Sequence, residues 1–430
     1  YSEYKDSGIY YIPLIPSSWN VLKGKILFKE EKRPIRQQDE IVTCFRDGQV
    51  TLRKNRRLEG FTNSLKEIGY QGIRKGDLVI HNMDAFAGAI GVSDSDGKAT
   101  PVYAVCTPIR EDVNQYYYCF LLRFLAKIGL IQSLAKGIRE RSSDFRYGDF
   151  KELLLPVPSR AEQDAIVSYL DAATSKIDKA IVMQQKMIDL LNERKQIIIQ
   201  NAVTKGLDEN VEMKNSGVEW IGMIPKHWEI KRLKYVMHSY GRIGFRGYGT
   251  DDIVDEGQGA ITLSPSNIQD SSMDYSKKTY LSWKKYYESP EIMIKNGDVL
   301  MVKTGSSYGK CAVVKDLPME CTINPQLVVF KEHKEFSEFL AYSFQTTFAK
   351  CFINTSVIGG TIPTISQEKI NNYIFPFPSK SEQQAIVAYL DKEMQRFDSA
   401  ITNCQRQIAL LQERKQIIIN EVVTGKVKVS

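Results

Sequence analysis

The sequence contains one long segment twice, and this internal repeat constrains the fold more than any other feature. Residues 156–199 begin Pro-Val-Pro-Ser and end Glu-Arg-Lys-Gln-Ile-Ile-Ile, and they return without a gap as residues 376–419. Roughly half of about 50 aligned positions are identical, far more than chance gives within one chain. A fainter repeat lies upstream, where residues 7–19 are echoed by residues 216–228. The chain is therefore predicted to be two tandem units, each with a lead-in segment, a long variable domain and a long helix.

The repeated segment has the sequence features of a long helix. Pro-x-Pro precedes it, Ser159 can cap its start and Glu162 follows three residues later, a capping box that Ser379 and Glu382 repeat. Apolar or small residues keep mainly three-and-four spacing in both copies: Ile166, Leu170, Ala173, Ile177, Ala180, Ile188 and Leu191, then Ile386, Leu390, Phe397, Ile401, Ile408 and Leu411. Glycines mark the far ends, at Gly206 and Gly425. About 40 residues at 1.5 Å each predict two coiled-coil rods of roughly 60 Å.

The variable parts, about 20–155 and 229–375, share a plan although their sequences differ. Each has short β-rich runs, then one amphipathic helical stretch, then a final strand. The runs lie at 77–80, 102–105, 298–302 and 326–330, and the helical stretches near 114–136 and 335–352. The predicted fold class is α+β, with two globular α/β domains separated by two long antiparallel coiled-coil helices in a pseudo-twofold tandem repeat. The expected boundaries are 1–158 for the N-terminal domain, 159–205 for the central helix, 206–378 for the C-terminal domain and 379–430 for the C-terminal helix.

Motifs for catalysis are incomplete in this chain. Residues 305–310, Gly-Ser-Ser-Tyr-Gly-Lys, are one residue too short for a phosphate loop, and Cys311 replaces the hydroxyl residue that would hold magnesium. Residues 324–327, Asn-Pro-Gln-Leu, lack the second proline and the aromatic residue of amino-methyltransferases. No Gly-x-Gly-x-x-Gly occurs. We therefore expect no catalytic residue and no cofactor.

Composition points to a reduced, metal-free protein. The seven cysteines are odd in number and never spaced as Cys-x-x-Cys, which favours free thiols over a disulfide framework. Only four histidines occur, and no zinc constellation is visible. No apolar run reaches the roughly 18 residues that a membrane span needs. We expect a cytoplasmic protein without membrane contact, and its net charge of +7 suits a polyanionic partner.

Basic, aromatic and small polar residues interleave in loop-like stretches of both variable domains. Glycine allows close backbone approach, Arg and Lys meet phosphates or guanine edges, and Ser and Thr can read base edges. The candidates in the first domain are Arg53, Lys54, Arg56, Arg57, Arg139, Arg141 and Arg146. Those in the second are Arg242, Arg246, Tyr248, Lys303, Thr304, Ser306, Ser307, Tyr308 and Lys310. A solvated charged surface remains an alternative for any one of them, whereas the loops as a set favour DNA.

Taken together, the two lead-in segments and the two Pro-x-Pro-Ser helices ending Glu-Arg-Lys-Gln-Ile-Ile-Ile resemble the specificity subunits of type I restriction–modification systems. The resemblance covers essentially the whole chain. Residues 76–83 followed by 100–103, and 297–309 followed by 361–363, are similar to recurrent target-recognition patterns of that family. They add His81, Asn82 and Thr361 to the candidate DNA contacts. The family varies these domains to change its target, so no single base-reading residue carries over.

The resemblance implies a DNA-reading subunit without catalysis of its own. Each target-recognition domain would read one half of a bipartite, asymmetric site in double-stranded DNA, and the helices would measure the unread spacer. Two modification (methyltransferase) subunits would dock on the helical region, and restriction subunits would add ATP-driven translocation and cleavage. Two other classes stay open on the sequence alone: a coiled-coil scaffold with two protein-binding heads, and an unrecognised nuclease or methyltransferase.

Overall fold

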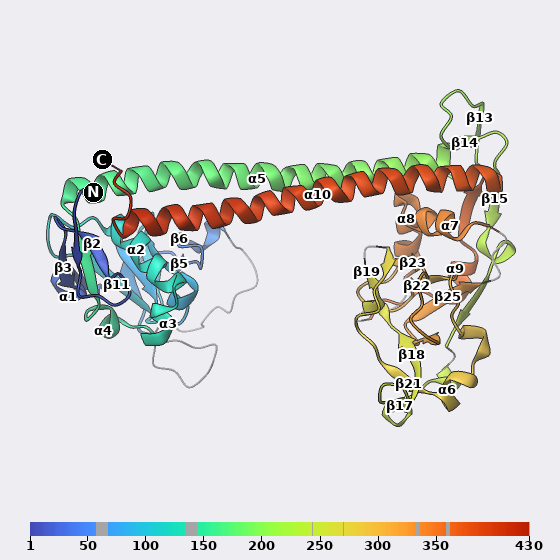
Figure 1. Ribbon diagram of the computed structural model, residues 1–430, viewed down its shortest axis with the longest axis horizontal. Coiled ribbons are helices and arrows are strands. Elements are labelled where there is room, and N and C mark those ends of the chain that lie inside the picture. The colour runs from blue at the N-terminus through green and yellow to red at the C-terminus, as the bar shows by residue number, and fades with distance from the viewer. Residues whose placement is uncertain are drawn as a thin grey trace. The chain divides into compact units, whose positions relative to one another are not determined.

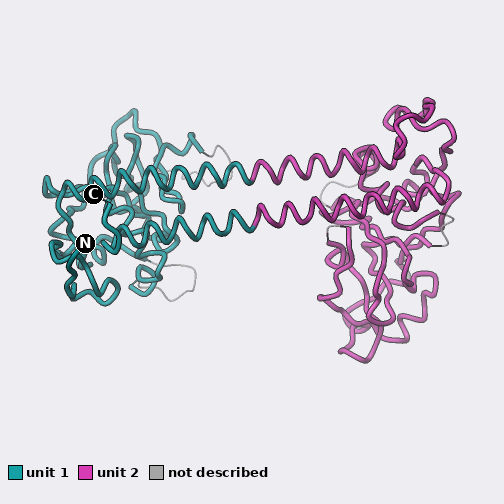
Figure 2. Tube along the Cα trace, turned by 45° about the horizontal axis from the view of Figure 1, so that its top comes forward, with its two compact units in different colours: residues 1–184, 406–430 teal, residues 185–405 magenta. Residues whose placement is uncertain are grey.

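Two long helices contain the repeated segment, α5 (Arg160–Lys205) and α10 (Lys380–Val423) (Figure 1). The structure is a computed structural model that describes residues 1–56, 68–134, 144–242, 244–269, 271–331, 335–357 and 362–429. It divides into unit 1, residues 1–184 with 406–430, and unit 2, residues 185–405 (Figure 2). Each unit therefore contains one variable domain, part of α5 and part of α10. Gly206 and Gly425 follow the helices in the left-handed conformation, with φ of 78° and 73°, as predicted.

Within each unit the two helix segments run antiparallel. In unit 1 Ile166 and Leu170, early in α5, share a core with Val422 and Val423, at the end of α10. Further along the same pair, Lys415 Nζ lies 2.7 Å from Asp178 Oδ1. Unit 2 repeats both contacts. Ala202 and Val203 share a core with Ile386 and Leu390, and Lys195 Nζ lies 2.6 Å from Asp398 Oδ1. These positions correspond in the sequence repeat, so the repeat encodes the pairing of the helices.

The predicted capping boxes form only in part. Ser159 Oγ accepts a hydrogen bond from the Glu162 amide at 3.4 Å, and Ser379 Oγ accepts one from the Glu382 amide at 3.3 Å. The two carboxylates, however, turn to the lead-in segments. Glu382 accepts from the indole Nε1 of the buried Trp228 at 3.0 Å, and Glu162 accepts from the Tyr1 hydroxyl. The glutamates thus join each helix start to its own domain.

The domain of unit 1 is built on a four-stranded antiparallel sheet in the order β4-β11-β8-β9. Its strands are β4 (Phe28–Glu30), β8 (Leu78–His81), β9 (Ile90–Val92) and β11 (Tyr103–Pro108). Four further pairs of short strands surround it: β1 (Tyr4–Asp6) with β2 (Leu14–Pro16), β3 (Asn20–Lys23) with β12 (Leu154–Val157), β5 (Val42–Cys44) with β6 (Val50–Leu52), and β7 (Gln71–Ile73) with β10 (Gly97–Ala99). The helices are α1 (Gly24–Leu27), α2 (Gln115–Lys127), α3 (Leu130–Leu134) and α4 (Tyr147–Phe150).

The domain of unit 2 has the same central sheet and a second one. The central order is β16-β25-β22-β23, from β16 (His238–Gly241), β22 (Val299–Val302), β23 (Cys311–Val313) and β25 (Leu327–Lys331). The second order is β17-β21-β18-β24, from β17 (Ile253–Val254), β18 (Gly259–Leu263), β21 (Tyr280–Ser282) and β24 (Cys321–Ile323). The remaining strand pairs are β13 (Met213–Asn215) with β14 (Met223–Pro225), β15 (Glu229–Arg232) with β26 (Ile374–Phe377), and β19 (Ile268–Gln269) with β20 (Ser272–Met273). The helices are α6 (Trp283–Tyr287), α7 (Ser337–Phe344), α8 (Thr347–Ser356) and α9 (Gln367–Asn371).

Strand β22 shows why the central sheet forms where it does. Its four residues are fully buried, and alternate side chains enter different cores. Val299 and Met301 pack with α7, α8 and the long helices, whereas Leu300 and Val302 pack with the second sheet. Figure 1 shows α7 and α8 on the helix-facing side of this sheet. A strand buried on both faces is continuously apolar, which is the pattern that marked residues 298–302 in the sequence.

The helical stretches predicted near 114–136 and 335–352 are each two helices. Gly129 lies between α2 and α3 with a φ of 82°. Thr346 caps the start of α8, where its side chain accepts a hydrogen bond from the Ala349 amide at 3.3 Å. Gly129 thus separates α2 from α3 and Thr346 starts α8, and a pattern of apolar spacing reveals neither boundary. The α+β class and the repeated plan of variable domain plus long helix are otherwise confirmed.

Candidate nucleic-acid interface

The two domains share a turn that leads into the middle of the central sheet. Gly76 and Gly297 adopt φ of 92° and 94°, and an aspartate follows each. Asp77 Oδ2 accepts from the Arg74 amide at 2.7 Å, and Asp298 Oδ2 accepts from the Lys295 amide at 2.8 Å. Both aspartates also pair with a cation, Arg33 for Asp77 and Lys331 for Asp298. This turn fixes the start of β8 and of β22 in the same way.

The residues that follow these strands are Asn82 and Lys303, and their backbones are held alike. The Asn82 amide donates to the Val102 carbonyl at 2.9 Å, and the Asn82 carbonyl accepts from the Phe145 amide at 3.0 Å. The Lys303 amide donates to the Gln326 carbonyl at 2.8 Å, and its carbonyl accepts from the Ile365 amide at 2.9 Å. Phe145 and Ile365 are both fully buried. We call this shared arrangement the strand-end frame. It consists of the residue after the strand, Asn82 or Lys303, and the two residues that its backbone bonds.

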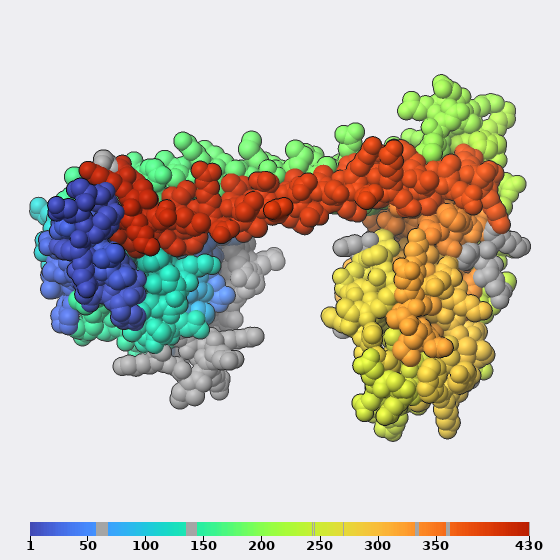
Figure 3. All heavy atoms as spheres, viewed as in Figure 1, coloured from blue at the N-terminus to red at the C-terminus, as the bar shows by residue number. Residues whose placement is uncertain are grey.

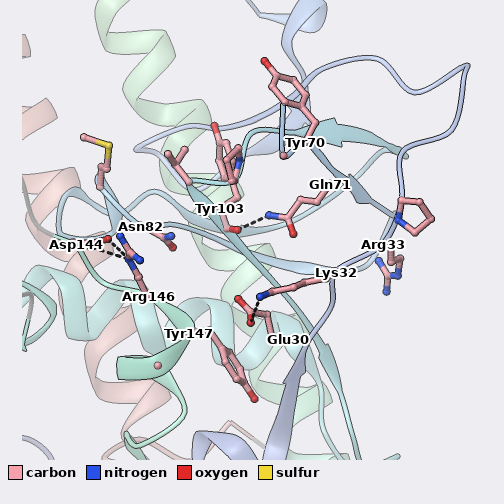
Figure 4. A pocket seen from close by; sticks show the side chains of 16 residues that line it. Glu30, Lys32, Arg33, Tyr70, Gln71, Asn82, Tyr103, Asp144, Arg146 and Tyr147 are labelled. Atoms are coloured by element: carbon pink, nitrogen blue, oxygen red, sulfur yellow. Dashed lines mark hydrogen bonds and ion pairs between the residues drawn. The ribbon is translucent and has the colours of Figure 1, made fainter. Parts of the chain in front are cut away.

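Asn82 lines a cleft of about 1210 Å³ in unit 1 (Figure 4). Asn82 is 9% exposed, and its Oδ1 has no hydrogen-bond partner. Other residues of the cleft come from distant parts of the chain and include Lys32, Arg33, Tyr70, Gln71, Tyr103, Arg146 and Tyr147. Several of their polar groups are satisfied within the protein, since Gln71 Nε2 donates to the Tyr103 carbonyl at 2.6 Å and Arg146 Nε lies 2.8 Å from Asp144 Oδ2.

Lys303 is half-buried and has no hydrogen-bond or ion-pair partner for its ammonium in the described part of the chain. Burial lowers the pKa of Lys303 from its usual value. Its Nζ lies against the backbone of Gly241, where a Cβ would be 3.2 Å from it. The absence of a side chain at Gly241 therefore leaves room for the lysine.

His81, next to Asn82, is shielded rather than presented to solvent. Its ring meets Tyr103 edge-on at 4.7 Å between centroids, and its Nδ1 accepts from the Asp84 amide at 3.2 Å. Burial is the main cause that lowers its pKa, so the neutral imidazole is favoured.

The predicted basic loop of the first domain is engaged in local pairs. Lys54 Nζ lies 2.5 Å from Glu40 Oε2 and Arg56 Nη1 lies 2.6 Å from Asp47 Oδ2. The Arg56 guanidinium also covers the ring of Phe45 at 4.3 Å, and Arg53 Nε donates to Thr43 Oγ1 at 3.2 Å. Arg57, Arg139 and Arg141 lie outside the described residues.

Arg242 does not present its guanidinium to solvent. It is 4% exposed, and it donates to the Ile323 carbonyl and to Thr322 Oγ1 at 3.0 Å each. A third bond, of 3.3 Å, reaches the Arg246 carbonyl, and the ring of Tyr248 lies 5.4 Å from the guanidinium carbon. Desolvation lowers the pKa of Arg242. Its structural role is to hold the glycine-rich loop of residues 244–249 against β24, a burial that the interleaved sequence pattern gave no means to predict.

Most of the remaining candidates in unit 2 lie in the loop between β22 and β23. Thr304 forms an isolated bridge with Thr364, and Arg246 Nη1 lies 3.1 Å from Glu291 Oε1. Ser306, Tyr308 and Lys310 line a hollow of about 490 Å³ with Gln196 and Lys350. Tyr308 donates to Asn354 Oδ1 at 3.1 Å, and the Ser307 carbonyl accepts from the Lys310 amide at 3.2 Å. Thr361 lies outside the described residues.

The described part of the chain holds neither a cluster of metal ligands nor a helix that could span a membrane. There, His, Cys, Asp and Glu form no group of three or more that could hold a metal ion. All seven cysteines are free thiols. Among the described helices, none is both long and apolar enough to cross a membrane.

Comparison with known proteins gives a consistent result. Residues 225–412 match the model of the type I restriction modification DNA specificity domain. The chain is 24% identical over 326 residues to the type I restriction enzyme MjaVIII specificity subunit of Methanocaldococcus jannaschii. The aligned region covers 75% of this chain and 71% of that protein. A chain solved in a study of the assembly and conformational transition of the type I R-M system matches with a TM-score of 0.73 at 16% identity, covering 96% of this chain and 99% of that one. The HsdS subunit of Thermoanaerobacter tengcongensis matches with a TM-score of 0.53 at 17% identity over 96% and 98% of the two chains. Residues 225–412 thus match the type I restriction modification DNA specificity domain, and the chain is similar to type I specificity subunits in sequence and to the two solved chains in fold.

Proposed function

We propose that this chain is the non-catalytic, DNA-reading subunit of a type I restriction–modification complex, and that each domain reads one half of a bipartite, asymmetric target. The observation that carries the proposal is the duplicated strand-end frame. Both domains use the same sheet order and the same backbone bonds, yet they differ in the side chains placed there, Asn82 in one and Lys303 in the other. Two copies of the strand-end frame that carry different polar side chains suit two different half-sites.

The helices provide the docking surface for two modification subunits. Exposed apolar residues recur at matching positions of the repeat, where a helix pair alone gives no reason to keep them. Unit 1 exposes Tyr169, Leu410 and Ile417, and unit 2 exposes their counterparts Tyr389, Leu190 and Ile197, each between 39% and 60%. Figure 3 shows α10, in red, uncovered along the face in view. Because each unit carries one such set, two copies of one partner fit better than a single copy. Restriction subunits would join the same complex.

The test is a methylation assay with and without the modification subunits. The purified chain alone should transfer no methyl groups and cut no DNA. Together with the modification subunits it should direct methylation to one bipartite motif, read by methylome sequencing of a strain with and without the gene. Turnover by the chain alone would identify an enzyme instead. A methylome that does not depend on the gene, with protein partners still bound, would favour the scaffold class.

A further inference from the structure

Asn82 and Lys303 occupy equivalent places, and the equivalence extends well beyond these two residues. Residues 74–93 align with residues 295–314 without a gap, so that Gly76 matches Gly297 and Gly88 matches Gly309, all four with positive φ. The backbone bonds match as well. The Ser93 amide donates to the Asp77 carbonyl at 2.9 Å, and the Val314 amide donates to the Asp298 carbonyl at 2.8 Å. The strand-end frame is thus one structural position that occurs once in each unit.

At this position both side chains carry a polar group that the protein leaves unpaired. Burial without a hydrogen bond costs about 1–3 kcal/mol for a neutral polar group, so such groups are rare and call for a partner. Asn82 Oδ1 is buried and unpartnered. Lys303 is half-buried, and burial alone lowers its pKa, with no carboxylate or hydrogen-bond acceptor beside it among the described residues that would raise that pKa. By contrast, Asn114, which is also buried in unit 1, has its carboxamide satisfied by Asp164 and by the Tyr116 amide.

The two unpaired groups differ in what they can recognise. A carboxamide offers one acceptor and two donors, which match the N6 amino group and N7 of adenine in the major groove. A lysine ammonium offers donors alone, which match the O6 and N7 acceptors of guanine. We propose that Asn82 and Lys303 are the equivalent base-reading residues of the two domains, Asn82 for an adenine in one half-site and Lys303 for a guanine in the other. This inference rests on the proposed function and adds which residue reads each half.

The experiment uses the full chain assembled with its modification subunits and a library of DNA duplexes randomised at every position of the motif. Methylation rates for all four bases at each position give a preference profile. Asn82→Asp keeps the size of the side chain but removes its amide donors, and Asn82→Ala removes the whole reading group. Each should lower the preference for adenine at one position of one half-site by roughly 5- to 150-fold. Lys303→Met should do the same for guanine in the other half-site, and Lys303→Arg should retain the guanine preference.

Matched controls separate base reading from stability and from charge. Asn114→Ala removes a buried but fully bonded asparagine from unit 1, so it should lower thermal stability and leave every base preference unchanged. Lys315→Met removes one positive charge from unit 2 at a site where the lysine pairs with Glu338 at 3.0 Å. This variant should change the methylation rates of all DNA sequences alike.

The outcomes distinguish this inference from the proposed function. If the wild-type complex methylates no defined motif, the proposed function fails before any variant is made. If the wild type reads a bipartite motif and the Asn82 and Lys303 variants keep its complete preference profile, the assignment of these two residues is wrong. A change in the same half-site for both residues would also overturn it.

Discussion

The same face of the central sheet is covered by different strands in unit 1 and in unit 2. In unit 1 the short strands β5, β6, β7 and β10 close a small core around Val42, Val50 and Val105. In unit 2 that place is taken by the four-stranded sheet β17-β21-β18-β24, which closes a larger core around Ile261, Leu263 and Val329. The opposite face, toward α2 or toward α7 and α8, is alike in both. The covering layer can therefore be exchanged while the strand-end frame and its attachment to the long helices stay the same.

The largest effect is expected where each domain joins its helices. Trp19 in unit 1 and Trp228 in unit 2 are fully buried and lie against Gly425 and Gly206. Replacing either tryptophan with alanine should lower the free energy of unfolding by about 3–5 kcal/mol. The matched control is Trp220, which is 46% exposed. Its replacement with alanine should lower the free energy of unfolding by much less. Urea unfolding gives the magnitude.

Hydrogen exchange read by mass spectrometry locates the effect of these tryptophan variants. Trp19→Ala should reduce amide protection in unit 1, and Trp228→Ala should reduce it in unit 2. An equal loss of protection in both units for either variant would mean that the two units do not form separate cores.

An intermediate effect is expected for the basic loop of the first domain. Replacing Arg53, Arg56 and Arg57 with alanine should weaken DNA binding by the assembled complex, and each lost phosphate contact should reduce the slope of log affinity against log salt by about 0.9. Lys310→Ala, an exposed position in unit 2, should give a smaller effect of the same kind on the other half-site. Fluorescence anisotropy over a salt series measures both. An unchanged slope in the triple variant would show that this loop does not contact the DNA phosphates.

The smallest effect concerns the repeated ion pairs of the helices. Asp178→Asn and Asp398→Asn each remove one partner of a pair whose aspartate side chains are 54% and 60% exposed. Exposed pairs contribute about 0.2–1 kcal/mol, so both variants should show small and equal losses that disappear at high salt. Thermal unfolding at two salt concentrations tests this. A loss confined to one of the two variants would show that the helix pairs are not equivalent.

Much of this architecture could be predicted from the sequence because it is repeated or periodic. The long helices, their glycine ends and the buried strands after Gly76 and Gly297 all follow from local patterns. The candidate site was less accessible to prediction. The cleft beside Asn82 brings together Lys32, Gln71 and Tyr147, which lie far apart in the sequence, and no periodic signal connects them. Arg242 has the composition of a DNA contact, and only its tertiary surroundings reveal that it is buried.

The alignment of Asn82 with Lys303 was similarly hidden, although the signal was present. A Gly-Asp pair precedes a β-rich run in both domains, at 76–77 and at 297–298. Five residues beyond each aspartate stand Asn82 and Lys303, whose side chains are chemically unlike.

Exchange of one domain shows whether the two domains read their half-sites independently, as we propose. Residues 20–155 would be replaced with the matching domain of a relative that methylates a different motif, and the methylome of the resulting strain would be sequenced. We expect a new motif in which one half is altered while the other half and the spacer length are retained. A motif altered in both halves would contradict this proposal, because recognition would then depend on the two domains acting together.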